Sequence, residues 1–90
     1  MAPKLDPDVA DEVPWSETIT DYDLDHLVTY LRLLDADRDE ADWRQAAAIV
    51  LARDVEHDSD RSRRCWESHL ERARWMTTKG YHQLLAREVR

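Results

Sequence analysis

The scarcity of glycine restricts the fold of this chain more than any other sequence feature. Gly80 is the only glycine among 90 residues, and phenylalanine is absent. The apolar residues are mainly Leu, Ala, Val and Trp, in patterns that favour helices over turn-rich sheets. We therefore predict an all-α fold, and the length predicts one domain with a modest core.

The first predicted helix has a defined start. Thr20 followed by Asp23 is typical of an N-cap with a carboxylate in the first turn. We expect this helix to begin near Asp21 and to end between Asp35 and Arg38. Helical spacing predicts one buried stripe, which comprises Leu24, Leu27, Val28, Leu31 and Leu34.

A second helix is predicted after a cap at Asp39 or Asp42, and it should end near Arg53. Its apolar residues with helical spacing are Trp43, Ala46, Ala47 and Val50. Three consecutive alanines, residues 46–48, make the helix thin, so another helix could approach closely as in a helix-turn-helix. The polar spacer DVEHDSD, residues 54–60, is longer than an ordinary helix-turn-helix turn.

The third predicted helix is the longest and is capped by Ser59 or Asp60. Its inward stripe comprises Ser62, Trp66, His69, Leu70, Ala73 and Met76. Gly80 suits the left-handed position that follows a helix. Residues 81–90 should form a short fourth helix that closes the bundle. The predicted architecture is a three-helix helix-turn-helix variant with a lengthened turn and this additional helix.

We predict that residues 1–17 form a disordered acidic tail. Pro3, Pro7 and Pro14 stand among acidic side chains, and few apolar groups are present to offset the entropy of ordering. Trp15 is the exception, because an aromatic residue beside a domain edge often packs onto it. We expect the folded domain to occupy residues 18–90.

The net charge of −7 is unevenly distributed along the chain. Residues 1–60 carry 5 basic and 17 acidic side chains, a net −12, whereas residues 61–90 carry 8 basic and 3 acidic, a net +5. A negative field repels the phosphate backbone at long range. The overall charge therefore argues against nucleic acid as the main partner, and the basic final third keeps that possibility open.

No membrane segment, cofactor, metal or catalytic site is predicted. No stretch approaches the roughly 18 apolar residues of a membrane span, and no signal peptide is recognisable, so we expect a cytoplasmic protein. Cys65 is the only cysteine and suits a helix-packing thiol. The four histidines lack ligand spacing, and neither a nucleophile motif nor a phosphate-binding loop occurs.

The first helix has a second row of side chains, opposite its predicted core stripe. Its members are Tyr22, His26, Thr29 and Leu33, with Tyr30 at its flank and Asp25 and Asp37 at its rim. One interpretation is a partner-binding face, because aligned aromatic and apolar groups with an acidic rim resemble an interface. The other is an ordinary surface, on which isolated apolar residues are common.

The outward face of the third helix is basic. It carries Arg61, Arg64, Arg72 and Trp75, together with Ser68 and Lys79. Such a face is typical of a recognition helix that binds DNA. The alternative is a solvated face, because Glu67 and Glu71 stand at helical spacings where they can pair with the arginines. The sequence favours this second interpretation.

Three segments together resemble a known family. They are ITDYDLDHLVTYLRLLDAD, ADWRQAAAIVL and HLERARWMTTKGYHQLL. The chain is similar, over about residues 15–86, to the proteobacterial family named after the DNA-binding domain of the RovC transcription regulator. The resemblance implies a helix-turn-helix with a lengthened turn, which agrees with the long DVEHDSD spacer.

The resemblance also implies a function. Activators of this family, found on integrative and conjugative elements, join such a domain to a separate N-terminal domain. An acidic version without that domain resembles antiactivators, which implies binding to an FseA-like transcriptional activator, or to a quorum-sensing regulator, and a block of excision and transfer. The implied mechanism is mimicry of the activator's own second domain. The acidic spacer and Glu67 and Glu71 depart from a positively charged DNA-binding face, and this departure argues against DNA binding.

Overall fold

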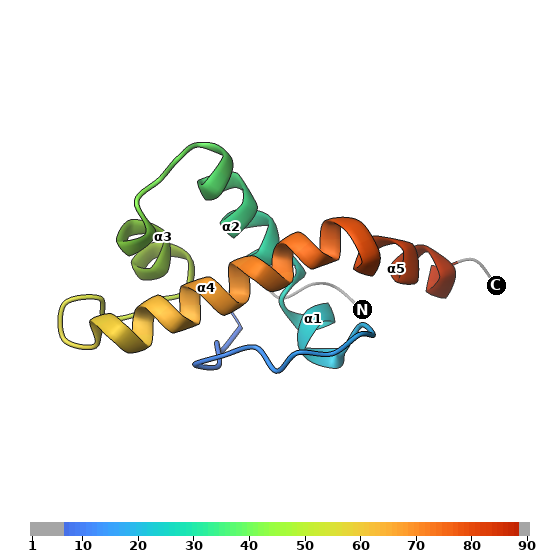
Figure 1. Cartoon of the computed structure of the whole chain (residues 1–90), viewed down its shortest axis with the longest axis horizontal. Helices are drawn as coiled ribbons and strands as arrows, with labels where there is room; N and C mark the ends of the chain where they lie inside the picture. The colour runs from blue at the N-terminus through green and yellow to red at the C-terminus, as the bar shows by residue number, and fades with distance from the viewer. Residues whose placement is uncertain (1–6, 89–90) are drawn as a thin grey trace.

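The structure, a computed structural model, describes residues 7–88, the side chains of 87 and 88 excepted. Its elements are α1 (Asp21–Asp25), α2 (Leu27–Arg38), α3 (Trp43–Val50), α4 (Ser59–Trp75), the π-helical turn η1 (Met76–Gly80) and α5 (Tyr81–Glu88). These residues contain no strand, which confirms the all-α prediction. In Figure 1, α4, η1 and α5 form one long rod, with α2 and α3 on one side and α1 with the N-terminal residues on the other. No helix in this part of the chain is long and apolar enough to cross a membrane.

The first predicted helix starts as expected but is broken at His26. Thr20 Oγ1 accepts a hydrogen bond from the Asp23 amide at 3.2 Å, and an Asp23 carboxylate oxygen accepts one from the Thr20 amide at 3.0 Å. This reciprocal capping box confirms the predicted cap. His26 then leaves the helical conformation, with φ −113° and ψ 20°, and separates α1 from α2. The prediction of one continuous helix is therefore wrong at this residue, although α2 does end at Arg38.

The buried face of α2 also differs from the prediction. Tyr30 and Leu33 are 2% and 1% exposed, whereas Leu31 is 61% exposed. The predicted stripe is therefore wrong for Leu31, and its other members are only half-buried. The prediction from helical spacing assumed one straight helix whose buried face is determined by the apolar residues alone. Tyr30 faces inward instead, because its hydroxyl donates to buried Asp23 at 2.7 Å.

α3 is shorter than predicted. Its N-cap is Asp42, one of the two expected, and it ends at Val50 rather than near Arg53. Ala52 adopts a positive φ of 54°, which an α-helix does not allow. Ala46 and Ala47 are buried, and α3 contacts α4 directly, so the small side chains permit the close approach that the sequence predicts.

Asp54 organises the turn between α3 and α4, residues 51–58. Its carboxylate accepts hydrogen bonds from the amides of Glu56 at 3.2 Å and His57 at 3.1 Å. The bond from the His57 amide, with the His57 ring 2.8 Å away, lowers the pKa of Asp54. Ser62 Oγ donates to the Asp54 carbonyl at 3.1 Å and joins the turn to α4. The lengthened turn is thus confirmed, and α4 is capped by Asp58, one residue earlier than predicted.

Gly80 does not end the long helix. It lies in η1 without a positive φ, so the predicted left-handed position is wrong. A Cβ at this position would lie 2.7 Å from Trp75 Cζ3 and 2.8 Å from Met76 Sδ. Close packing, rather than backbone conformation, therefore explains the glycine. The predicted fourth helix, α5, continues the rod through η1 (Figure 1).

The core lies along α4 in two clusters. One contains Ile19, Tyr30, Ala73, Trp75 and Met76, and the other contains Leu33, Leu51, Cys65 and Leu70. The predicted stripe of α4 is confirmed, since Ser62, His69, Leu70, Ala73 and Met76 are buried and Trp66 is half-buried. Burial raises the pKa of the Cys65 thiol, as expected for a cysteine that packs between helices.

The N-terminal segment, defined as residues 8–13, runs along α4. Val13 is buried, and its amide donates to Ser68 Oγ at 3.2 Å. The Ala10 carbonyl accepts a hydrogen bond from the Cys65 thiol at 3.4 Å, and the Ala10 amide donates to the Tyr22 hydroxyl at 3.1 Å. Of the predicted disordered tail, residues 1–6 lie outside the described residues, whereas residues 7–17 have a defined conformation.

Candidate functional site

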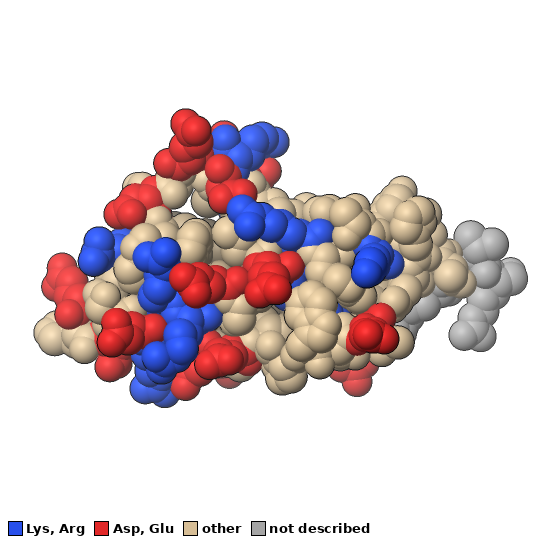
Figure 2. Space-filling model, viewed as in Figure 1, with Lys and Arg blue, Asp and Glu red and all other residues tan. Residues whose placement is uncertain are grey.

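Three arginines occupy the first turns of α4 on its outward side. Arg61, Arg63 and Arg64 are exposed, while Ser62 and Cys65 point into the core. Figure 2 shows basic and acidic side chains intermingled at the end of the molecule that contains α3 and the start of α4. Fewer charges lie over the end formed by η1 and α5 (Figure 2). The first turns of α4 are thus the candidate contact surface for an anion.

Asp11 of the N-terminal segment bridges two arginines. Its carboxylate oxygens lie 2.9 Å from Arg61 Nη2 and 2.9 Å from Arg53 Nη1. The hydrogen bond from Arg61, together with the charges of both arginines, lowers the pKa of Asp11. Arg53 Nη2 also donates to the carbonyl of Val9 at 2.7 Å. Both a side chain and the main chain of the segment therefore contact these arginines. We call Arg53, Arg61, Arg63 and Arg64 together the basic surface.

The other two arginines are also paired within the chain. Arg64 Nε lies 3.7 Å from a carboxylate oxygen of Glu12, which belongs to the N-terminal segment. Arg63 Nε donates to Glu67 at 2.8 Å across one helical turn. This pairing follows the i, i+4 spacing that the sequence analysis identified for Glu67. Every arginine at the start of α4 thus has a carboxylate partner from its own chain.

The predicted DNA-facing residues lie in two different environments. Arg61 and Arg64 are exposed, in agreement with the prediction. Arg72 and Trp75 are buried, so their assignment to an outward face is wrong. The prediction placed Arg72 outside because it lies opposite the apolar stripe of the helix, whereas the N-terminal chain covers this side and a buried carboxylate, that of Asp23, compensates its charge. A recognition surface on α4 is therefore restricted to its first turns.

Arg72 joins α4 to the residues that precede α1. Its guanidinium donates from Nη2 at 2.6 Å and from Nε at 3.0 Å to the two carboxylate oxygens of Asp23. Its remaining bonds go to the carbonyls of Ser16 at 2.5 Å and Thr18 at 2.9 Å. Burial opposes ionisation of Asp23, but the bonds from Arg72, the Thr20 amide and Tyr30 outweigh it and lower the pKa of Asp23. The Arg72–Asp23 pair therefore has a structural role.

A second candidate surface is an apolar groove between α2 and the rod. Its volume is about 300 Å³, and its lining residues are Leu27, Tyr30, Leu31, Leu34, Ala73, Met76, Thr77, Tyr81 and Leu84. Leu31 and Tyr81 are 61% and 51% exposed at its edge. This groove was not predicted from the sequence, because Leu31 was expected in the core and the long helix was expected to end at Gly80. Helical spacing from Ala73 through Leu84 across Gly80 would have indicated it.

The family of the chain follows from a match that covers almost all of it. A family model described as the DNA-binding domain of a T6SS transcription factor, of the RovC type, matches residues 3–86. The chain belongs to the RovC-type DNA-binding domain family. No curated protein matches it at a significant level. The description of this family is that of a DNA-binding domain within a transcription factor.

In this RovC-type domain, the predicted partner-binding face lies mostly inside the protein. That face comprised Tyr22, His26, Tyr30, Leu33 and Asp37. His26, Tyr30 and Leu33 are buried, so a protein partner cannot reach them and their assignment is wrong. Tyr22 is half-buried and only Asp37 is exposed. The error has the same origin as the wrong core stripe, since the face predicted to be outward is more deeply buried than the predicted stripe.

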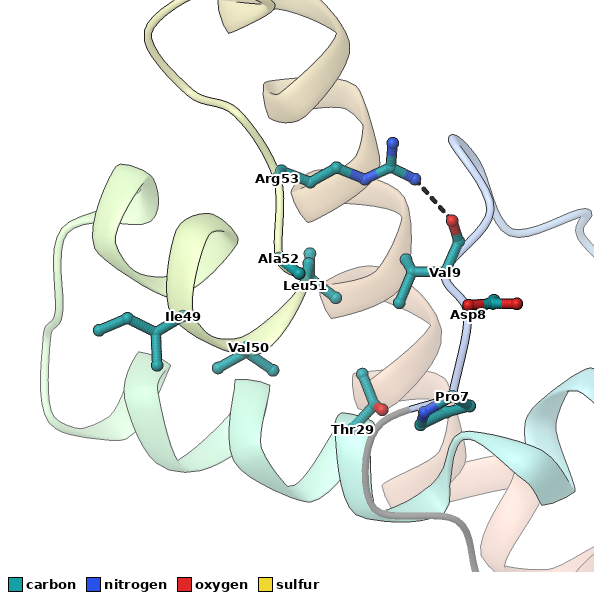
Figure 3. A pocket seen from close by; sticks show the side chains of 9 residues that line it. All are labelled: Pro7, Asp8, Val9, Thr29, Ile49, Val50, Leu51, Ala52 and Arg53. Carbon is teal, nitrogen blue, oxygen red and sulfur yellow. Dashed lines mark hydrogen bonds between the residues drawn. The ribbon is translucent and has the colours of Figure 1, made fainter.

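A cavity of about 330 Å³ separates the N-terminal segment of the RovC-type domain from the end of α3 (Figure 3). Pro7, Asp8 and Val9 form one wall, Thr29 of α2 another, and residues 49–53 the third. The bond from Arg53 to the Val9 carbonyl crosses its edge (Figure 3). The lining mixes apolar and charged groups, and among residues 7–86 no three His, Cys, Asp or Glu side chains converge to hold a metal.

A buried polar network connects the N-terminal segment to α1 and α4. His69 Nδ1 lies 2.7 Å from the Cys65 carbonyl, which can only accept, so Nδ1 carries the proton. His69 Nε2 then accepts the hydrogen bond of the Tyr22 hydroxyl at 2.5 Å. Burial lowers the pKa of His69 to about 4. Because the Ala10 amide donates to Tyr22, the chain of bonds fixes the segment beside α4.

Proposed function

We propose that this chain regulates transcription by binding a transcriptional activator and blocking it, as an antiactivator. One observation carries the proposal. The exposed arginines at the start of α4, which would have to contact phosphates if this helix bound DNA, are paired with carboxylates of the same chain. A net charge of −7 adds long-range repulsion of nucleic acid.

We further propose that the chain resembles the antiactivator QseM, and this proposed likeness names the class of partner. It implies an FseA-like activator, contacted through its N-terminal domain, and regulation of excision and transfer of a conjugative element. The chain would occupy that domain in place of the activator's own RovC-type domain. A quorum-sensing regulator is a further partner that the resemblance implies.

We place the protein-binding surface at the apolar groove instead of the buried face. Leu31 and Tyr81 offer exposed apolar contact area beside a concave site, which is how a small docking surface is usually built. The groove lies away from the start of α4, where the charged residues gather (Figure 2). An activator bound there leaves the N-terminal segment in place.

Calorimetric titration tests the proposal directly. The chain is titrated into the purified N-terminal domain of the activator, and separately into operator duplex at low salt. We expect a stoichiometric complex with the protein and none with the duplex. In a reporter strain, the chain should lower activator-dependent transcription in proportion to its concentration. A complex with duplex alone would refute the antiactivator proposal.

DNA binding is the second candidate function, and two observations favour it. The family description is that of a DNA-binding domain, and three arginines share the exposed first turns of α4. This function predicts an affinity that falls steeply as the salt concentration rises. A mobility-shift assay at low salt tests it, and the absence of a shift would dispose of DNA binding by the wild-type chain.

A further inference from the structure

The N-terminal segment places two carboxylates against the arginines at and beside the start of α4. Asp11 contacts Arg61 and Arg53 at 2.9 Å, and Glu12 lies 3.7 Å from Arg64. Carboxylate and phosphate oxygens bind guanidinium groups through the same charge-assisted hydrogen bonds. An anionic ligand of the basic surface must therefore compete with Asp11 and Glu12.

The N-terminal segment is attached by two kinds of interaction, hydrogen bonds to its backbone and exposed ion pairs of its side chains. Its backbone is held by the bonds from Arg53 to the Val9 carbonyl and from the Val13 amide to Ser68. The ion pairs of Asp11 and Glu12 with α4 are about half exposed, with side-chain exposures between 49% and 65%. Exposed pairs of this kind contribute little free energy each. The carboxylates can therefore leave the arginines without unfolding of the domain.

We infer that residues 8–13 are an intramolecular competitor that keeps duplex DNA from the start of α4. With the segment in place, Arg61 and Arg64 are neutralised by their own chain. When Asp11 and Glu12 are displaced or lose their charge, the two arginines become available to phosphates of a duplex. This device does not depend on an activator partner, and it goes beyond the antiactivator function.

The test compares two double variants with the same net charge. D11N/E12Q removes the two competing carboxylates from the basic surface. The control D39N/E40Q removes two exposed carboxylates from the connection between α2 and α3. Binding of a fluorescent 20-base-pair duplex is measured by anisotropy at several salt concentrations. Both variants replace exposed groups with amides of the same shape, and circular dichroism checks that both remain helical.

We expect D11N/E12Q to bind the duplex roughly tenfold more tightly than D39N/E40Q, because two more cations reach phosphates. The slope of log K against log salt concentration should be steeper by about 2. Adding R61Q and R64Q to D11N/E12Q should abolish the gain. Equal affinities of the two double variants, a gain that survives R61Q and R64Q, or no binding by either variant would overturn the inference.

A parallel titration with the activator's N-terminal domain separates this inference from the proposed function. D11N/E12Q should bind that domain as the wild-type chain does, because the groove is unchanged. If the wild-type chain does not bind the activator domain while D11N/E12Q still binds the duplex more tightly than D39N/E40Q, the proposed function alone is refuted. Activator binding without any DNA gain would refute the competitor alone.

Discussion

Asp23 and Arg72 form an ion pair from which solvent is entirely excluded. The pair joins α1 to the last turn of α4, two elements far apart in sequence, with hydrogen bonds of 2.6 Å and 3.0 Å. The Arg72 guanidinium also lies 3.8 Å from the centre of the Trp75 ring and 5.0 Å from that of Trp15. Because Arg72 holds residues 16–18 as well, the pair positions the chain that leads from the N-terminal segment into α1.

Replacing Arg72 by methionine should destabilise the domain by about 3–5 kcal/mol, because it leaves the Asp23 carboxylate buried without its cation. Urea unfolding followed by tryptophan fluorescence measures the change. R64M is the matched control, since Arg64 is exposed and its replacement should change the free energy of unfolding little. Equal midpoints for R72M and R64M would contradict the assigned role of the pair.

The free energy of unfolding should fall as the pH is lowered from 6.5 to 4. Burial lowers the pKa of His69 from 6.5 to about 4, so the unfolded chain binds a proton that the folded protein excludes in this range. The contribution is fully present above pH 6.5, and about 3 kcal/mol is lost by pH 4. The lowered pKa of Asp23 adds a further loss only below its ordinary value of 3.8.

Urea titrations at pH 7, 5.5 and 4.5 measure this dependence. H69Q should flatten it, whereas H82Q, at an exposed position, should leave it unchanged. A dependence of the same size in H69Q would show that another group is responsible.

Charging the groove should weaken binding to the activator without unfolding the domain. L31E places a carboxylate at an apolar edge, and we expect at least a tenfold loss of affinity, about 1.4 kcal/mol. I49E is the matched control, because Ile49 is 72% exposed and lies outside the groove. Calorimetry with the activator domain measures both variants, and identical affinities would exclude the groove.

L33E should behave differently from L31E. Leu33 is 1% exposed and belongs to the core cluster with Leu51, Cys65 and Leu70. A buried carboxylate without a partner should unfold the domain. Circular dichroism distinguishes loss of folding from loss of binding, and a folded L33E would contradict the assignment of this face to the core.

G80A should destabilise the rod at η1. The added Cβ would lie 2.7 Å from Trp75 Cζ3, and the resulting overpacking costs about 1–3 kcal/mol. The higher helix propensity of alanine offsets about 1 kcal/mol of this overpacking cost. Thermal unfolding should therefore show a lower midpoint for G80A, whereas K79A, at the exposed neighbouring position, should not. A midpoint at or above that of wild type would contradict the packing argument.

Local rules predicted much of the helical framework. The capping box at Thr20, the α4 stripe, the small residues of α3 and the long turn all depend on near neighbours in the chain, and each was recognisable. The same rules failed for α2 because both of its faces carry apolar groups. Hydropathy alone could not tell that Tyr30 and Leu33 face inward.

The sequence by itself determined the class of fold, the number and order of the main helices, and the uneven distribution of charge. Only the tertiary structure decided which charges are buried and which are paired. Asp23 and Arg72, or Asp11 and Arg61, are about 50 residues apart, and the energy of a charge depends on burial and on the partner beside it. Helical periodicity carries no information about such distant partners, so both predicted faces had to be revised.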